Sequence, residues 1–180
     1  MFGHLFACKE IKSNPGGTKN HSTKSFYDFT LKSLDGKDIN FAQYKGKKIL
    51  IVNTASKCGY TPQYAELEEL HKKYGDKLVI LGFPANNFLH QEPGSNTDIG
   101  EFCTKNYGVT FQMFEKIDVV GKNQAPLYKW LSDKSLNGWN DNAPSWNFCK
   151  YIIDENGELS YFFNSKVTPL SDEMIKALGF

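Results

Sequence analysis

The stretch KILIVNTASKCGYTPQYAELEELHKKY, residues 48–74, decides the fold of this chain. Its first part, residues 49–52, is an unbroken aliphatic run, which is typical of a strand that is covered on both faces. Thr61 suits a helix N-cap, and Pro62 suits the first helical position. Apolar side chains then recur along one helical face, at Leu67, Leu70 and Tyr74. The stretch therefore predicts a buried strand, a short loop and an amphipathic helix.

Cys58 lies in the loop between this strand and this helix. Unpaired backbone N–H groups and the helix dipole favour an anion at such a position, and Lys57 adds a positive charge beside it. The thiolate is the reactive form of cysteine, so we expect Cys58 to be the reactive residue of the protein. The alternative is a small cysteine that is merely buried in a turn.

The composition limits the classes of function that need to be considered. With 180 residues, of which 40% are hydrophobic, the chain has enough material for one domain and too little for two. The 21 basic and 20 acidic residues are interspersed, so nucleic acid is not an expected partner. Every basic residue is a lysine, which excludes the bidentate guanidinium recognition of carboxylates and phosphates that arginine provides.

The four cysteines are far apart in the sequence, at Cys8, Cys58, Cys103 and Cys149. They form neither a CxxC pair nor a Cys/His group of metal-ligand spacing, so we expect no metal and no cofactor. Free thiols fit a reducing compartment better than a disulfide scaffold does. We therefore expect a cytoplasmic protein.

The first 25 residues are expected to form a flexible leader, because residues 11–25 are polar and aperiodic. Residues 5–8, Leu-Phe-Ala-Cys, resemble the lipobox of bacterial lipoproteins, but residues 1–4 supply neither a lysine-rich nor an adequate apolar segment. A truncated start would make an envelope lipoprotein, acylated at Cys8, the alternative to the cytoplasm. No segment approaches the roughly 20 apolar residues that cross a bilayer.

The rest of the chain, residues 26–180, alternates strand and helix patterns. A hairpin is expected over residues 26–41, around Asp35-Gly36, and a second one around Asn156-Gly157. Further strands are predicted over residues 78–83, 114–120, 148–153 and 159–163. Helices are predicted over residues 97–106 and 126–132 and from Ser171 onwards. This order predicts one α/β domain with a mixed sheet.

The chain resembles the glutathione peroxidase family in three ordered motifs, NTASKCGYTPQY (53–64), LGFPANNF (81–88) and WNF (146–148), with QEPGSN (91–96) between the second and the third. The resemblance covers about residues 26–178. It implies a thioredoxin-like, three-layer α/β/α sandwich with a central mixed sheet. It also implies a thiol peroxidase that reduces hydrogen peroxide and organic or lipid hydroperoxides through Cys58, in the response to oxidative stress.

The same resemblance implies roles for further residues. Trp146 and Asn147 occupy matching positions of the family's site, and Asn87 stands where we place the family's catalytic glutamine. Asparagine is one methylene shorter and reaches the sulfur only if the backbone comes closer. Cys103, within EFCTKNYGV, falls where thioredoxin-dependent members carry a resolving cysteine. The alternative for Trp146 and Cys103 is ordinary burial in the core.

Thioredoxin is the electron donor that the resemblance favours, with glutathione as the alternative. The stretch between Trp130 and Trp146 lacks the insertion of tetrameric relatives, which implies a monomer. Two other classes of function stay open. One is a redox sensor that relays oxidation from Cys58 to a partner protein. The other is a thioredoxin-like disulfide reductase, which ordinarily has a second cysteine where this chain has Thr61.

Overall fold

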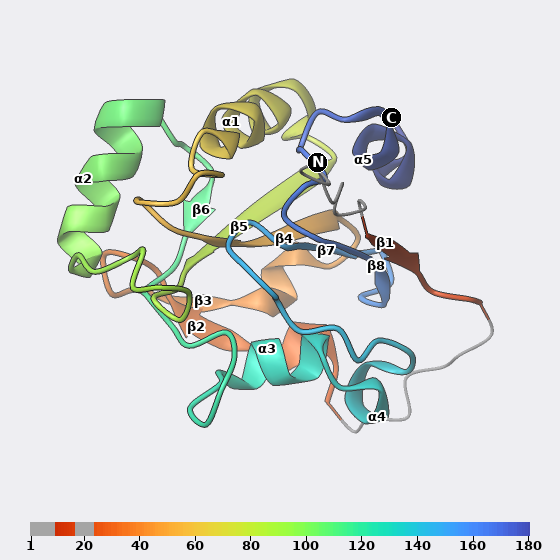
Figure 1. Cartoon of the computed structure of the whole chain (residues 1–180). Helices are drawn as coiled ribbons and strands as arrows, with labels where there is room; N and C mark the ends of the chain where they lie inside the picture. Colours follow the sequence, from red (N-terminus) through yellow and green to blue (C-terminus); the bar gives the residue numbers. More distant parts are fainter. Residues whose placement is uncertain (1–9, 17–23) are drawn as a thin grey trace, which may run out of the picture.

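A six-stranded mixed sheet forms the centre of the molecule (Figure 1). The computed structural model describes residues 10–16 and 24–180. The strands lie in the order β1 (Ile11–Ser13), β8 (Leu159–Phe163), β7 (Lys150–Ile153), β4 (Lys48–Thr54), β5 (Leu78–Pro84) and β6 (Gln112–Met113). Strands β4, β5 and β6 are parallel, and β7, β8 and β1 join them in antiparallel pairs. The mixed sheet agrees with the prediction from the sequence.

Helices cover both faces of this sheet, which makes three layers (Figure 1). On β4, Leu50 and Val52 pack against one face with helices α1 (Gln63–Tyr74), α2 (Asn96–Tyr107) and α5 (Asp172–Leu178). Ile49 and Ile51 pack on the other face with helix α3 (Pro126–Leu131) and two short 3₁₀ turns, Phe26–Asp28 and Phe41–Tyr44. Both faces of β4 are therefore buried, as its aliphatic run predicts.

The other predicted elements lie close to their expected positions. The first hairpin consists of β2 (Thr30–Lys32) and β3 (Asp38–Asn40). Ser95 caps α2 and Ser171 caps α5 through their side chains, and Gly157 has the positive φ of 82° that the second hairpin needs. None of the described helices is both long enough and apolar enough to span a membrane.

Residues 114–120 do not form the strand that their apolar pattern predicts. Only Gln112–Met113 pairs with β5, as β6. Beyond it, the amides of Phe114 and Ile117 donate to the carbonyl oxygens of Gly82 and Pro84, without a continuous ladder. Phe114 and Val119 are buried, so the pattern reflects packing against the core and not strand geometry.

Two further elements were not expected from the sequence. Ile11–Ser13, within the predicted leader, forms β1 and pairs antiparallel with β8, with Ile11 opposite Phe163. Helix α4 (Lys134–Asn137) is a single turn capped by Asp133. The lipobox-like residues and Cys8 lie outside the described part of the chain.

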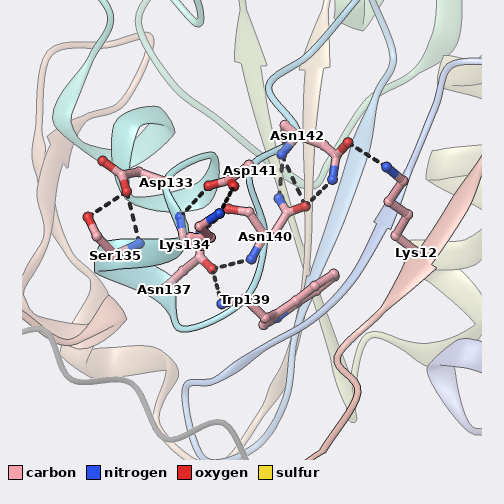
Figure 2. A network of polar contacts seen from close by, with 9 residues as sticks. All are labelled: Lys12, Asp133, Lys134, Ser135, Asn137, Trp139, Asn140, Asp141 and Asn142. Atoms are coloured by element: carbon pink, nitrogen blue, oxygen red, sulfur yellow. Dashed lines mark hydrogen bonds and ion pairs between the residues drawn. The ribbon is translucent and has the colours of Figure 1, made fainter.

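A polar network fastens the segment that leads from α4 towards Trp146 (Figure 2). The Asn137 side chain accepts hydrogen bonds from the amides of Trp139 and Asn140, and the Asn140 side chain accepts from the amide and the side chain of Asn142. The Trp139 indole N–H donates to the Leu159 carbonyl oxygen at 2.7 Å. The Trp139 bond holds the segment against β8, and the asparagine bonds fix its local shape.

Candidate active site

Cys58 lies in a tight loop that follows β4, with 8% of its surface exposed. Its amide donates to the Thr61 hydroxyl at 3.0 Å, and this hydroxyl donates to the Ala55 carbonyl oxygen at 2.8 Å. The amide of Tyr60 donates to the Cys58 sulfur at 3.3 Å. An N–H group aimed at the sulfur interacts favourably with negative charge there.

Thr61 thus has a different role from the one expected. Helix α1 begins at Gln63, with Pro62 before it and no side-chain cap. The amide of Cys58 and the carbonyl oxygen of Ala55 have no helix or strand partner in this loop. The Thr61 hydroxyl accepts from the first and donates to the second, so it satisfies both groups and holds the loop together.

A second segment, residues 85–92, packs beside the Cys58 loop. The amide of Lys57 donates to the carbonyl oxygen of Gln91 at 3.0 Å. The Ser56 hydroxyl donates to the carboxylate of Glu92, whose own amide donates to the Asn86 side chain at 3.0 Å. These bonds hold the backbone of Gln91 and the side chain of Glu92 against the loop that carries Cys58.

The third segment, residues 146–148, is docked on the end of β4 through Asn53. The Asn53 side-chain amide donates to the Trp146 carbonyl oxygen at 3.0 Å, and the Phe148 amide donates to the Asn53 carbonyl oxygen at 2.7 Å. Phe148 adopts a φ of +67°, which is uncommon for an aromatic residue. Strain of this kind persists only where the surroundings fix it, so the segment is tightly constrained.

Buried Asn147 connects this third segment to the second one. Its side-chain amide donates to Oε1 of Gln91 at 3.0 Å. The Trp146 ring packs on Phe88, with the ring centroids 5.6 Å apart. The three motif segments therefore meet at the carboxyl ends of β4 and β5, the edge where ligands bind in open α/β sheets.

The structure does not bring Asn87 into this group. Its side-chain amide donates to the Asp118 carboxylate at 2.9 Å, and its oxygen accepts from the Val119 amide at 2.8 Å. The side-chain oxygen that accepts from the Asn147 amide belongs to Gln91, which does not match the family's glutamine position. Gln91 is the first residue of the motif QEPGSN and lies only four residues after Asn87.

Cys103 lies on α2 and is buried, with 2% of its surface exposed. Burial raises the pKa of its thiol to about 11. Cys149 is buried as well, just before β7, and its sulfur lies 3.6 Å from the Ser165 hydroxyl. All three cysteines in the described residues are free thiols, and no cluster that could hold a metal ion occurs among those residues.

A buried lysine binds the backbone of the segment of residues 146–148. Lys150 is fully buried, and its ammonium donates to the carbonyl oxygens of Phe148 and Val167, each at 2.7 Å. Burial lowers the pKa of Lys150 to about 7, while the nearby Cys149 and Glu66 act in the opposite direction.

Two cavities flank the Cys58 loop. One, of about 340 Å³, lies between the loop and α2 and is mainly apolar, with Ser56, Pro93 and Phe102 among its lining. The other, of about 310 Å³, is lined by Tyr60, Trp146 and Lys166 among others. The second cavity is lined by Tyr60, the residue whose amide faces the Cys58 sulfur.

Comparisons with known proteins agree with this arrangement. A family model described as glutathione peroxidase matches residues 26–132. Glutathione peroxidase-like peroxiredoxin 2 of Saccharomyces cerevisiae is 51% identical over 158 residues, which are 87% of this chain and 98% of the yeast protein. The apo crystal structure of Trgpx is 36% identical, with a TM-score of 0.65 over 88% of this chain and 98% of the other.

A more distant likeness concerns the fold alone. A thiol:disulfide interchange protein of the thioredoxin family from Chlorobium tepidum is 17% identical, with a TM-score of 0.58 over 89% of this chain and 98% of that one. The central sheet and its covering helices are therefore those of the thioredoxin-like fold, as the sequence motifs implied.

Proposed function

Because this chain belongs to the glutathione peroxidase family, we propose that its peroxidase reaction takes place at Cys58. The protein is a thiol peroxidase. The observation that supports Cys58 as its reacting residue is the Tyr60 amide aimed at the sulfur, in a loop bonded to the backbone of Gln91, whose side chain binds Asn147. A thiolate held in this way is a nucleophile towards hydrogen peroxide and organic hydroperoxides.

In the first step the Cys58 thiolate attacks one peroxide oxygen and becomes a sulfenic acid. The O–O bond breaks, and the leaving alkoxide or hydroxide takes up a proton. We assign stabilisation of the developing charge to the indole N–H of Trp146 and to the side-chain amide of Asn147. Gln91 holds Asn147 in position for this role through its hydrogen bond, and it replaces Asn87 in the proposal.

In the second step Cys103 attacks the sulfenic acid and closes a disulfide with Cys58. Since Cys103 is buried within α2, this step requires local unwinding of that helix. Thioredoxin, a dithiol, then reopens the disulfide. Two observations support this donor: the peroxiredoxin name of the yeast relative, and the absence of arginine from the sequence, since glutathione-using members resemble one another in an arginine-containing rim.

A coupled assay of NADPH consumption with hydrogen peroxide tests the electron donor. We expect sustained consumption with thioredoxin and its reductase, and little with glutathione and its reductase. Turnover with glutathione alone would replace thioredoxin as the donor, and a single oxidation without turnover would favour the redox sensor.

Cysteine variants test the two sulfur roles in the same assay. Cys58→Ser should abolish peroxide consumption, whereas Cys103→Ser should consume one equivalent without thioredoxin-driven cycling. Cys149→Ser is the matched control, because Cys149 is equally buried but lies on the opposite side of the sheet from Cys103. Full thioredoxin-supported turnover by Cys103→Ser would contradict the resolving role.

A further inference from the structure

Asn53 is a buried asparagine near the end of β4 that interrupts the aliphatic run of the strand. Residues 49–52 are Ile-Leu-Ile-Val, and Asn53 follows them with none of its surface exposed. Its side-chain amide donates to the Trp146 carbonyl oxygen at 3.0 Å. Its side-chain oxygen is buried and has no hydrogen-bond partner among residues 10–16 and 24–180. The polar end of this side chain therefore lies in the interior with half of its hydrogen-bonding capacity unused.

A half-used amide at this position needs an explanation. Burial of a polar group without a partner disfavours folding, and most buried polar groups in proteins are paired. A leucine has nearly the same size, would continue the pattern of the strand and would bury no unpaired oxygen. What an asparagine offers here and a leucine does not is the bond to Trp146.

That bond holds the peptide group between the two residues to which we assign stabilisation of the developing charge. The carbonyl oxygen of Trp146 belongs to the peptide that joins Trp146 to Asn147. Because a peptide group is planar, its orientation determines ψ of Trp146 and φ of Asn147 together. A rotation of this peptide would therefore move the indole and the side-chain amide relative to the Cys58 sulfur.

The backbone of Asn53 binds the next two residues of the same segment. The Phe148 amide donates to the Asn53 carbonyl oxygen at 2.7 Å, and the Asn53 amide donates to the Cys149 carbonyl oxygen at 3.4 Å. Any residue at position 53 has the main-chain groups for these two bonds, so only the bond to Trp146 requires an asparagine. Cys58 follows Asn53 by five residues, so this side chain connects the Trp146 segment to the strand that leads to the sulfur.

We propose that Asn53 is a positioning residue, and that its bond to the peptide of residues 146–147 directs both side chains to the oxygen that leaves when Cys58 is oxidised. This inference rests on the proposed function. In that step one peroxide oxygen bonds to the sulfur, the O–O bond breaks, and the leaving oxygen carries the charge that the two N–H groups stabilise before it is protonated. A displaced peptide weakens this stabilisation and leaves the sulfur itself unchanged.

Asn53→Leu and Asn53→Ala test the positioning role. Both remove the donor to Trp146; leucine nearly keeps the size of the side chain, and alanine avoids any steric conflict that leucine introduces. Circular dichroism establishes that each variant is folded, and stopped-flow measurement with hydrogen peroxide gives the second-order rate of Cys58 oxidation. We expect this rate to fall by about 10- to 100-fold, because donors for a developing oxyanion act only when they are well placed.

Alkylation of Cys58 by iodoacetamide separates positioning from a general disturbance of the site. This reaction needs the thiolate but produces no oxygen anion, so its rate should change by less than about threefold in both variants. Asn137→Ala is the matched control, because Asn137 of α4 is buried as well and its side-chain amide donates to the Trp130 carbonyl oxygen at 2.9 Å. We expect the control to keep both rates.

A combined variant examines whether Asn53 acts through the two donors. Trp146→Phe together with Asn147→Ala removes the indole N–H and the side-chain amide. In this background Asn53→Leu should slow peroxide oxidation by less than about threefold further, because no donor is left to position.

The outcomes distinguish the inference from the proposed function. The positioning role would be overturned by a normal peroxide rate in a folded Asn53 variant, by an equal fall of the peroxide and alkylation rates, or by the full loss in the combined background. A normal peroxide rate when Trp146 and Asn147 are both replaced would overturn their assignment in the proposed function. Failure of peroxide to oxidise Cys58 in the unchanged protein would overturn the proposed function itself.

Discussion

Gln91 joins the loop of Cys58 to the segment of Trp146 and Asn147. Its backbone oxygen accepts from Lys57 and its side chain accepts from Asn147. Gln91→Ala removes the second bond and frees the Asn147 amide, so we expect the second-order rate with hydrogen peroxide to fall by about 10- to 100-fold. Stopped-flow measurement of the first oxidation gives this rate directly.

Asn87→Ala provides the comparison for that variant. Asn87 binds Asp118 and Val119, so its removal should lower stability by about 1–2 kcal/mol and change the peroxide rate by less than about threefold. If Asn87→Ala proved the slower enzyme of the two, the assignment of the positioning amide to Gln91 would be wrong.

Lys150 makes stability depend on pH in a defined window. Its pKa is about 7 in the folded protein and has the ordinary value of 10.5 when the chain unfolds. Between these values the unfolded chain binds one more proton, so the free energy of unfolding should rise with pH, by up to about 3 kcal/mol from pH 7 to 9. Denaturant unfolding of the reduced protein measures this rise.

Lys150→Met should flatten that rise, because the variant has no group to titrate there. It should also be less stable at pH 9, since the carbonyl oxygens of Phe148 and Val167 lose their donor. An equally steep pH dependence in the variant would assign the effect to another group. Lys129→Met, a change at an exposed lysine of α3, is the control.

At the scale of elements, the Cys58 loop depends on one hydroxyl. Thr61→Val keeps the shape of the side chain but leaves the Cys58 amide and the Ala55 carbonyl without their partner. We expect a loss of about 1–3 kcal/mol in stability and about a tenfold lower peroxide rate, because the sulfur is less well held. Thermal unfolding and stopped-flow kinetics measure the two effects.

Thr97→Val is the control, because Thr97 is exposed on α2. Both quantities should stay near those of the unchanged protein. A normal peroxide rate in Thr61→Val, with lowered stability, would mean that the hydroxyl serves the fold without serving the chemistry.

Elements with a strong local signal were predictable from the sequence. Residues close together in the sequence determine each of these elements: the aliphatic run of β4, the serine caps of α2 and α5 and the Asn-Gly turn. The irregular structure of residues 114–120 was not predictable, because Phe114 and Val119 are buried outside a strand and give the same apolar pattern as a strand would. Strand β1 has no apolar period, and its pairing with β8 depends on residues about 150 positions away.

The same distinction holds for the site. Cys58 was predicted to be reactive because its loop lies between two recognisable elements, and Trp146 and Asn147 were assigned to the site because their motif resembles a family; these roles stay predictions. The role of Gln91 depends on a hydrogen bond to a residue 56 positions later, which no local pattern encodes.

At the scale of the whole molecule, the short connection between Trp130 and Trp146 supports the proposal of a monomer. The segment folds back on β7 and β8 through the Tyr151 hydroxyl and the Trp139 indole. We expect the protein to elute in size-exclusion chromatography with light scattering at its chain mass of 20.4 kDa. A mass of twice or four times this value would contradict the proposal.

Strand β1 has a practical consequence for anyone who produces this protein. The match to the family model begins at residue 26, so a chain trimmed to that boundary would lose Ile11–Ser13. The backbone of β8 would then become the outer edge of the sheet, with Tyr161 to Phe163 open to pairing with another molecule. Such a trimmed enzyme could keep its chemistry and still precipitate during storage, for a reason unrelated to its active site.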